Sequence, residues 1–202
     1  MSKFTAGLII SLLSFSLFAE DTKGIKVGEI APQITTKDIN GATFNLENTL
    51  NNGPVVLVFY RGGWCPYCNR QLRKLQAEIV PELDKFNAKL VAISVDRLDE
   101  IEKTQKKQDL GMTLISDPMA SIIKRYNVVN QTSDSFVKTY KESYGIDIEA
   151  YSGQKHHIIA VPAIFTISSN GEVVFSYANE NYTIRAQNRD IISSLEELSQ
   201  SN

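Results

Sequence analysis

The stretch VVLVFYRGGWCPYCNRQL, residues 55–72, combines three local signals that decide the fold. It opens with a continuous β-branched and aromatic run, which is typical of a strand buried on both faces of a sheet. Gly62 and Gly63 interrupt that run, and Pro66 suits the first turn of a helix because its missing N–H costs nothing there. The stretch therefore predicts a strand, a tight loop and a helix, with the two cysteines of the chain at the junction of loop and helix.

The composition indicates a globular chain. Its 202 residues, 43% hydrophobic and 22% charged, suggest one domain of ordinary size or slightly more, with enough apolar material for a core. The net charge is −2 and no basic cluster stands out, so we expect neither nucleic acid nor an anionic membrane surface as a partner.

The first nineteen residues, MSKFTAGLIISLLSFSLFA, differ from the rest. Lys3 precedes an apolar run that is too short to span a bilayer, and the small residue Ala19 follows it. This pattern predicts a signal peptide over 1–19, a mature domain over 20–202, and a periplasmic or secreted bacterial protein without stable membrane insertion after cleavage. An N-terminal anchor and a buried helix are the alternatives.

Strand-like and helix-like segments alternate along the rest of the chain. The strand-like segments are 41–50, 54–60, 89–95, 112–116, 162–167 and 172–177, the last two joined as a hairpin. One helix-like segment directly follows the cysteines, and three others cover 97–111, 117–126 and 187–198. The polar, Tyr-rich residues 130–158 predict an insertion with one short helix.

This order predicts an α/β fold whose central mixed sheet carries helices on both faces. A parallel βαβ half is followed by an antiparallel half. Functional residues in such sheets lie beyond the carboxyl ends of the parallel strands, which is where the loop after Tyr60 is expected.

The spacing of the cysteines favours reactive thiols. Cys65 falls at or near the N-cap of the helix, where unpaired N–H groups and the helix dipole stabilise a thiolate, and Cys68 lies in the first turn. Arg61 and Arg70 are close enough in sequence to add positive charge. Either cysteine can resolve a mixed disulfide formed by the other. A static disulfide is the alternative, but so short a loop removes little entropy from the unfolded chain.

The sequence WCPYC after a buried strand resembles the thioredoxin superfamily, and its Pro-Tyr pair is the one that glutaredoxins usually carry. The wider chain, residues 26–198, is similar to the AhpC/TSA peroxiredoxins. The blocks that carry this likeness are VGEIAPQITTKDINGATFNL, VAISVD, ISDPMASIIKRYNV and PAIFTISSNGEVVF. RGGWCPYCNRQL resembles a bacterial peroxiredoxin-like subgroup. The resemblance implies a thioredoxin-like fold and a thiol-dependent oxidoreductase that needs no cofactor.

The chain departs from the peroxiredoxin pattern in its reactive loop. An ungapped alignment places Arg61 at the usual Pro position, Cys65 at the Thr position and Cys68 at the peroxidatic position. Thioredoxins use the first cysteine as the nucleophile. The two resemblances disagree, and we favour Cys65 because an N-cap favours its thiolate.

The second departure is Pro162, which stands where peroxiredoxins place an activating Arg. Thioredoxin-type reductases place a cis-proline there, so we expect a cis bond at Pro162, with a proline that merely begins a strand as the alternative. Arg61, Arg125 or Arg185 would then replace the missing Arg.

Two histidines and several tyrosines lie near this region in the sequence. His156 or His157 would act as an acid/base, would complete a copper or zinc site with the cysteines, or would be solvated loop residues. The tyrosines would line a substrate surface or simply pack: Tyr140, Tyr144, Tyr151 and Tyr182.

We predict first an exported peroxiredoxin-like antioxidant that reduces peroxides. The alternatives are a disulfide reductase of other exported proteins and, less favoured, a metal carrier. The first two need an external dithiol donor, either thioredoxin-like or a membrane thiol-transfer protein. The expected catalytic residues are Cys65, Cys68, Pro162, Arg61 and Trp64. The expected substrate-binding residues are Gly62, Gly63, Tyr67 and Val161.

Overall fold

The computed structural model describes residues 23–200, so the predicted signal peptide lies outside the described residues. Its centre is a five-stranded sheet in the order β5-β4-β3-β8-β9. The strands are β3 (Val55–Phe59), β4 (Lys89–Ser94), β5 (Thr113–Ser116), β8 (Ala163–Ile167) and β9 (Val173–Ala178). β3, β4 and β5 are parallel, whereas β8 and β9 continue the sheet in antiparallel fashion. The predicted mixed sheet and α/β class are confirmed.

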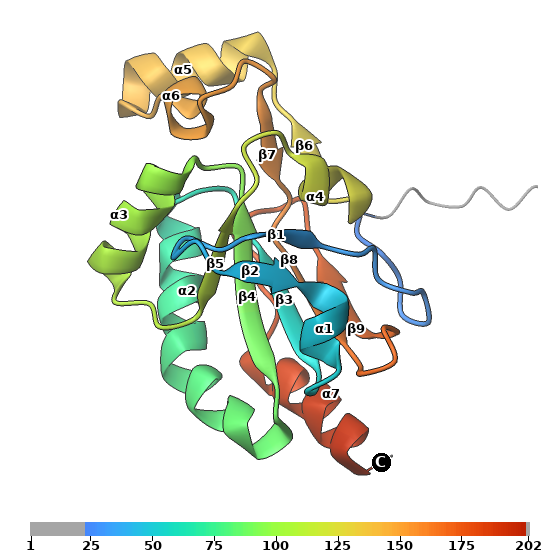
Figure 1. Cartoon of the computed structure of the whole chain (residues 1–202). Helices are drawn as coiled ribbons and strands as arrows, with labels where there is room; N and C mark the ends of the chain where they lie inside the picture. The colour runs from blue at the N-terminus through green and yellow to red at the C-terminus, as the bar shows by residue number, and fades with distance from the viewer. Residues whose placement is uncertain (1–22, 201–202) are drawn as a thin grey trace, which may run out of the picture.

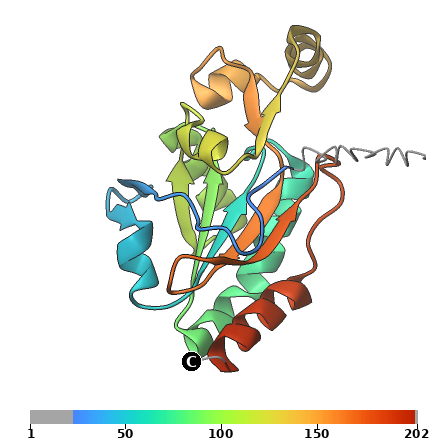
Figure 2. The ribbon, with the colours of Figure 1, turned by 90° about the vertical axis from the view of Figure 1, so that its right-hand side faces the viewer.

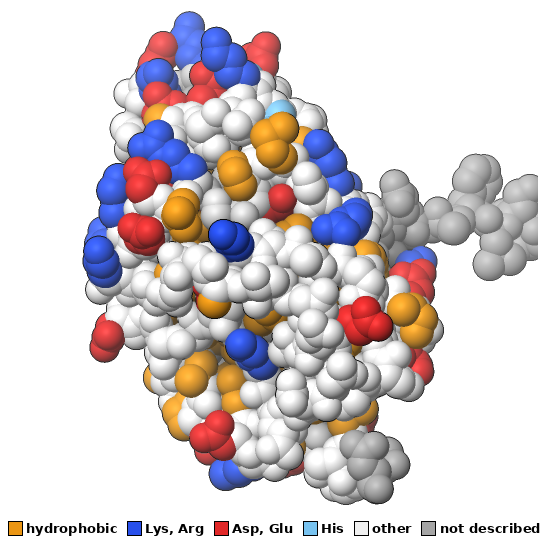
Figure 3. Space-filling view, viewed as in Figure 1, with side chains coloured by type: hydrophobic (Ala, Val, Ile, Leu, Met, Phe, Trp, Pro, Cys, Tyr) orange, Lys and Arg blue, Asp and Glu red, His pale blue; other side chains and the backbone are white. Residues whose placement is uncertain are grey.

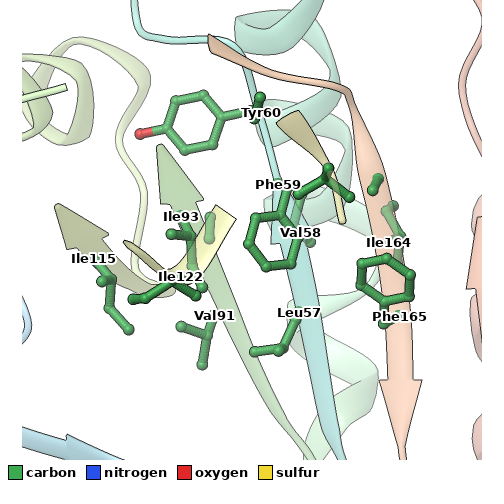
Figure 4. Packing of buried hydrophobic residues seen from close by; sticks show 14 of the residues in the cluster. Leu57, Val58, Phe59, Tyr60, Val91, Ile93, Ile115, Ile122, Ile164 and Phe165 are labelled. Carbon is green, nitrogen blue, oxygen red and sulfur yellow. The ribbon is translucent and has the colours of Figure 1, made fainter. Parts of the chain in front are cut away.

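The central strand β3 is buried along its whole length, as its apolar run predicts. Val58 lies between Ala92 of β4 and Ile164 of β8 in the register of the sheet. Figure 4 shows side chains of these strands packed together, with Phe59 near Phe165 and Tyr60 directly beyond the end of β3. Because hydrogen bonds and packing hold β3 on both sides, it is a rigid base for the loop that follows it.

Helices cover both faces of the sheet. They are α1 (Leu46–Leu50), α2 (Pro66–Glu78), the 3-10 helix η1 (Val80–Phe86), α3 (Leu98–Gln108), α4 (Ser121–Arg125) and α7 (Asn188–Gln200). Figures 1 and 2 show α2 and α7 against one face and α1 on the other. No helix among residues 23–200 is both long enough and apolar enough to cross a membrane.

Three predicted boundaries change. The segment 41–50 is strand only in β2 (Thr43–Asn45), which pairs with β1 (Thr35–Lys37), because the Asn45 side chain accepts from the Asn48 N–H and starts α1. α3 ends at Asp109 rather than at Gly111, because Asp109 itself adopts the left-handed conformation with φ 52°.

The third boundary is the start of α4, which begins at Ser121 rather than at Asp117–Pro118. The Asp117 carboxylate accepts hydrogen bonds from the N–H groups of Ser121, Ile122 and Ile123 at 2.8–3.0 Å. Those are N–H groups that a helix start leaves without intrahelical partners. Asp117 therefore does mark the start of a helix, but the helix begins four residues after it.

Residues 129–160 hold two helices instead of the one expected. The elements are β6 (Val129–Gln131), α5 (Asp134–Tyr144), α6 (Ile148–Ser152) and β7 (Ile158–Ala160), with β6 and β7 paired antiparallel. Figure 1 shows α5 and α6 above the sheet, beyond the carboxyl ends of β3 and β4. Acidic and basic side chains alternate over this end of the molecule, without a patch of one sign in that view (Figure 3).

The predicted cis bond at Pro162 is wrong, because the described residues contain no cis peptide bond. Val161 and Pro162 instead carry the chain from β7 directly into β8. The Val161 N–H donates to the Val128 carbonyl, and the Pro162 carbonyl accepts from the Asn179 N–H. These two hydrogen bonds fix the short link between β7 and β8.

Candidate active site

Cys65 is the N-cap of α2 and has extended backbone angles of φ −87° and ψ 115°. Pro66 occupies the first turn, as predicted, and Cys68 follows inside the helix. Both cysteines are free thiols, and Cys65 is 1% exposed while Cys68 is fully buried. The pair therefore lies at the carboxyl end of β3, beneath the molecular surface.

The pKa values of the two thiols are shifted in opposite directions. Hydrogen bonds from the side chain and the backbone of Cys68 lower the pKa of Cys65 to about 6, helped by the positive charges of Arg61 and Arg185. Burial raises the pKa of Cys68 well above its usual value, and the hydrogen bond to Cys65 raises it further. At neutral pH, Cys65 is the thiolate and Cys68 keeps its proton.

Two of the three candidate arginines face this pair. The Arg185 Nη2 lies 3.6 Å from the Cys68 sulfur. Arg61 is 3% exposed, at the loop after β3. Arg125, in contrast, donates hydrogen bonds to the backbone carbonyl of Gln33 and to that of Ser121, the first residue of α4. Arg70 lies over the Tyr67 ring at 5.5 Å.

Arg61 is a buried cation held by aromatic faces. Its guanidinium carbon lies 4.1 Å from the Tyr182 ring centroid and 4.9 Å from that of Trp64, and its Nη2 donates to the Tyr140 hydroxyl at 3.2 Å. Arg61 forms no ion pair with the acids of residues 23–200, and its Nε lacks a partner there. Cation–π contacts replace part of the hydration that the guanidinium loses on burial.

A pocket of about 290 Å³ opens over Cys65. Its lining residues are Arg61, Trp64, Cys65, Pro66, Tyr67, Tyr140, Tyr144, Ile146 and Tyr182. Trp64 contacts Tyr140 edge to face, with ring centroids 5.7 Å apart. Thus α5 supplies an aromatic wall, and three of the four tyrosines considered in the sequence line the pocket. Tyr151 does not; its carbonyl accepts from the Arg97 N–H.

Asp96 is the site residue that sequence reasoning missed. It is fully buried, its Oδ2 accepts from the Gly63 N–H at 2.6 Å, and its Oδ1 has no partner among the described residues. Burial raises the pKa of Asp96 to about 7. The sequence signal that could have identified it is an acidic residue two positions after the end of β4, at the edge where the carboxyl ends of parallel strands meet.

The two loop glycines make room for neighbours rather than for a substrate. At Gly62, with φ 152°, an added Cβ would lie 2.3 Å from the Trp64 Nε1 and 2.7 Å from the Asp96 Oδ1. At Gly63 a Cβ would lie 1.9 Å from the Thr104 Oγ1. A side chain at either position would force these neighbouring side chains to move.

The remaining predicted residues lie elsewhere. Val161 is fully buried between β7 and β8 and does not line the pocket. His156 contacts the Pro118 carbonyl at 2.7 Å, and His157 contacts Glu149 and Asp134 at 2.7 and 3.0 Å. Residues 23–200 contain no group of three His, Cys, Asp or Glu placed to hold a metal. The interpretations that join a histidine to the thiols, as acid/base or as metal ligand, are therefore wrong.

Known proteins are similar to this chain in sequence and in fold. It is 27% identical over 161 residues to peroxiredoxin Bcp of Escherichia coli, covering 78% of this chain and 97% of that protein. It is 26% identical over 118 residues to a 1-Cys peroxiredoxin of Dictyostelium discoideum, covering 55% of this chain but only 48% of that protein. The crystal structure of peroxidoxin BcpB from Mycobacterium tuberculosis matches with a TM-score of 0.66 at 18% identity, over 88% of this chain and 99% of the other.

The last likeness shows the fold, which is thioredoxin-like, as expected from the sequence. The sequence model of the AhpC/TSA family matches residues 27–176, which is most of the described chain. The chain therefore belongs to the AhpC/TSA family.

Proposed function

We propose that this chain is a thiol-dependent peroxidase that uses Cys65 and Cys68 as a dithiol–disulfide couple. The enzyme class, an oxidoreductase acting through thiols, is supported by the peroxiredoxin relatives. The observation that carries the proposal is a pair of hydrogen-bonded thiols of which Cys65 lines a pocket and Cys68 is buried beneath it. The pKa of Cys65 is lowered and that of Cys68 is raised. We also place the chain in the subgroup with an RGGWCPYC loop.

The reaction begins at the Cys65 thiolate. It attacks the terminal oxygen of a peroxide, a sulfur–oxygen bond forms, and the oxygen–oxygen bond breaks. The departing oxygen takes up a proton and leaves as an alcohol or water, while Cys65 becomes a sulfenic acid. Arg61 lines the pocket where that charge develops, so its guanidinium charge suits stabilisation of the leaving oxygen.

Cys68 completes the oxidation. Its sulfur attacks the Cys65 sulfenic sulfur, a disulfide forms, and the thiol proton of Cys68 leaves with the hydroxyl as water. Arg185 lies against Cys68 and favours its thiolate as the proton departs. An external dithiol, thioredoxin-like or a membrane thiol-transfer protein, then restores both thiols. No step in this scheme needs a cofactor.

We further propose that the protein is exported and acts in the periplasm or outside the cell. The support is the charged start, apolar run and small residue over 1–19. Neither nucleic acid nor a stably spanned membrane has a role in this proposal.

The test is rapid mixing of the reduced protein with a peroxide, followed by the fluorescence of Trp64, the single tryptophan. We expect a fast second-order signal that Cys65→Ser abolishes, whereas Cys68→Ser stops the reaction at the sulfenic acid. A rate no faster than that of a free thiol, together with rapid exchange with a protein disulfide, would instead establish the disulfide reductase.

A further inference from the structure

The peptide group between Gly62 and Gly63 links Asp96 to the backbone of Cys65. Its N–H, which belongs to Gly63, donates a hydrogen bond to the Asp96 Oδ2 at 2.6 Å. Its carbonyl, which belongs to Gly62, accepts from the Cys65 N–H at 3.1 Å. A peptide group is planar and rigid, so a change of orientation at one end is carried to the other. Asp96 is therefore connected to Cys65 through a single rigid unit.

Asn69 on α2 holds the same loop from the side of the helix. Its Nδ2 donates to the Gly63 carbonyl at 2.7 Å, and its N–H donates to the Cys65 carbonyl at 3.0 Å. The N–H and the carbonyl of Gly63 are thus both hydrogen-bonded, and so are those of Cys65. Among the acceptors of these four bonds, the Asp96 carboxylate alone lies outside the loop and α2, so it fixes the loop relative to β4.

Asp96 is fully buried and anchored in the sheet. Its N–H donates to the Ser94 Oγ of β4 at 3.2 Å, and its carbonyl accepts from the Ser116 Oγ of β5 at 2.7 Å. Its Oδ1 lies so close to the loop that a Cβ added at Gly62 would be 2.7 Å from it. That oxygen has no partner among the described residues, and burying such a group costs folding free energy. Stability alone therefore does not account for an acid at this position.

The ionisation of Asp96 is coupled to that of Cys65. Burial is the main reason why the pKa of Asp96 is raised to about 7; the hydrogen bond from Gly63 opposes this rise, and the negative charges of Glu100 and Cys65 add to it. Coupling is mutual, so an ionised Asp96 disfavours the Cys65 thiolate as much as that thiolate disfavours an ionised Asp96. The titratable groups that interact with Asp96 are Tyr60 after β3, Cys65 at the start of α2, Glu100 on α3 and Tyr151 on α6.

Building on the proposed peroxidase function, we infer that Asp96 is a positioning residue for Cys65 and acts through the Gly62–Gly63 peptide group. The ionised carboxylate accepts a charge-assisted hydrogen bond from the Gly63 N–H and holds the peptide group in the orientation that binds the Cys65 N–H. Protonation of Asp96 weakens this bond, because the acceptor loses its charge. Asp96 does not line the pocket over Cys65, so it influences the orientation and the acidity of the thiol rather than contacting the peroxide.

The first experiment follows the backbone amide signals of residues 63 and 65 by NMR while the pH is raised through neutrality. The protein carries Cys65→Ser, which removes the titration of the thiol but keeps the backbone donor at that position. We expect both amides to shift with one common midpoint, that of Asp96, and both shifts to disappear when Asp96→Asn is added. With Cys65 in place, the midpoint of Asp96 should lie higher, because the thiolate favours the protonated acid. An amide of Gly63 that titrates while that of residue 65 does not would overturn the inference, and so would the absence of any titration.

The second experiment compares the rate constant for the reaction of Cys65 with a peroxide in Asp96→Ala, Asp96→Asn and the matched control Asp117→Ala. Asp117 is also a buried acid that accepts from backbone N–H groups, but those groups belong to α4. We expect Asp96→Ala to slow the reaction about tenfold, because the thiol loses its orientation. Asp96→Asn keeps an acceptor for Gly63 and should recover part of the loss, whereas Asp117→Ala should react like the unmodified protein. No loss in Asp96→Ala, no recovery in Asp96→Asn or an equal loss in Asp117→Ala would contradict the inference.

The amide titration separates this inference from the proposed function. It involves no peroxide, and its variants keep an acceptor at position 96, so it is decisive even if Asp96→Ala does not fold. A common titration of both amides in a protein that reduces no peroxide would support the positioning role, and only the proposed function would fail. Independent behaviour of the two amides sinks the positioning role, whatever the peroxidase rate.

Discussion

The Arg185 guanidinium lies 3.6 Å from the sulfur of Cys68, although 117 positions separate the two residues in the chain. Its positive charge opposes the burial that raises the pKa of Cys68. The positive charge of Arg61 lowers the pKa of Cys65 more than that of Arg185 does. Arg61 therefore favours the thiolate of Cys65, whereas Arg185 acts on both thiols and lies closest to the one that carries the second step of the proposed oxidation.

Replacing Arg185 by Met should slow disulfide formation more than sulfenic acid formation. Without the guanidinium the pKa of Cys68 rises further, and one pKa unit corresponds to roughly tenfold less thiolate. A 1,3-diketone that traps sulfenic acids would then label Cys65 more heavily than in the unmodified protein. Arg189→Met, an exposed arginine on α7, is the control and should give normal trapping. Unchanged labelling in Arg185→Met would contradict this role.

Alkylation of Cys65 should follow a titration with a midpoint near pH 6. The thiolate is the reactive form, so the rate falls as the pH drops through that value. Cys68→Ala removes the hydrogen bond that contributes most to the low pKa, and Arg61→Met removes a neighbouring charge. Both should move the midpoint upward, with the larger shift in Cys68→Ala. Iodoacetamide rates across pH, read by mass spectrometry, measure this; a midpoint near 8 in the unmodified protein would refute it.

Asp96 should make the protein less stable as the pH rises from about 4 to about 7. Its pKa is raised in the folded state, so the folded chain holds a proton that the unfolded chain releases in that window. A shift of about three units corresponds to as much as ~4 kcal/mol of unfolding free energy. Asp96→Asn stays neutral and should lose this slope. Urea unfolding of both proteins across the window gives the difference, and parallel curves would contradict the prediction.

Asp117→Ala should destabilise the fold by about 1–3 kcal/mol, because three N–H groups at the start of α4 lose their acceptor. Urea unfolding at neutral pH measures the change. Asp117→Asn retains one carboxamide oxygen as an acceptor, so its free energy of unfolding should lie between that of Asp117→Ala and that of the unmodified protein. A change within 0.5 kcal/mol, roughly that of an ordinary surface substitution, would show that water replaces the carboxylate at no cost.

Much of the sheet was predictable because its strands are continuous apolar runs. β3 and β4 are buried almost throughout, and the hairpin of β8 and β9 follows a turn signal in the sequence. The ends of the helices were harder. The sequence favours Gly111 for the left-handed residue that ends α3, but Asp109 adopts that conformation instead. Asp117 accepts hydrogen bonds from the start of α4 although it lies four residues before the helix.

At the site, the local part was predictable and the long-range part was not. The position of Cys65 at the N-cap follows from Pro66 alone. The contact of Arg185 with Cys68 depends on how the segment before α7 returns to α2, which no local pattern records. Asp96 lies one strand away from the cysteine loop, and its importance comes from burial. The histidines illustrate the converse, because closeness in sequence to Pro162 did not bring them to the thiols.

The contact between Gly63 and Thr104 constrains how this active-site loop can change over evolution. A methyl group at position 63 would lie 1.9 Å from the Thr104 hydroxyl oxygen and 3.1 Å from its Cβ on α3, so Gly63→Ala requires Thr104 to move. A search for new redox behaviour that changes Gly63 while Thr104 keeps its position therefore meets this steric contact. Shortening Thr104 to Ala removes the hydroxyl that crowds position 63, and so a change on α3 widens the choice of residues at that position of the loop.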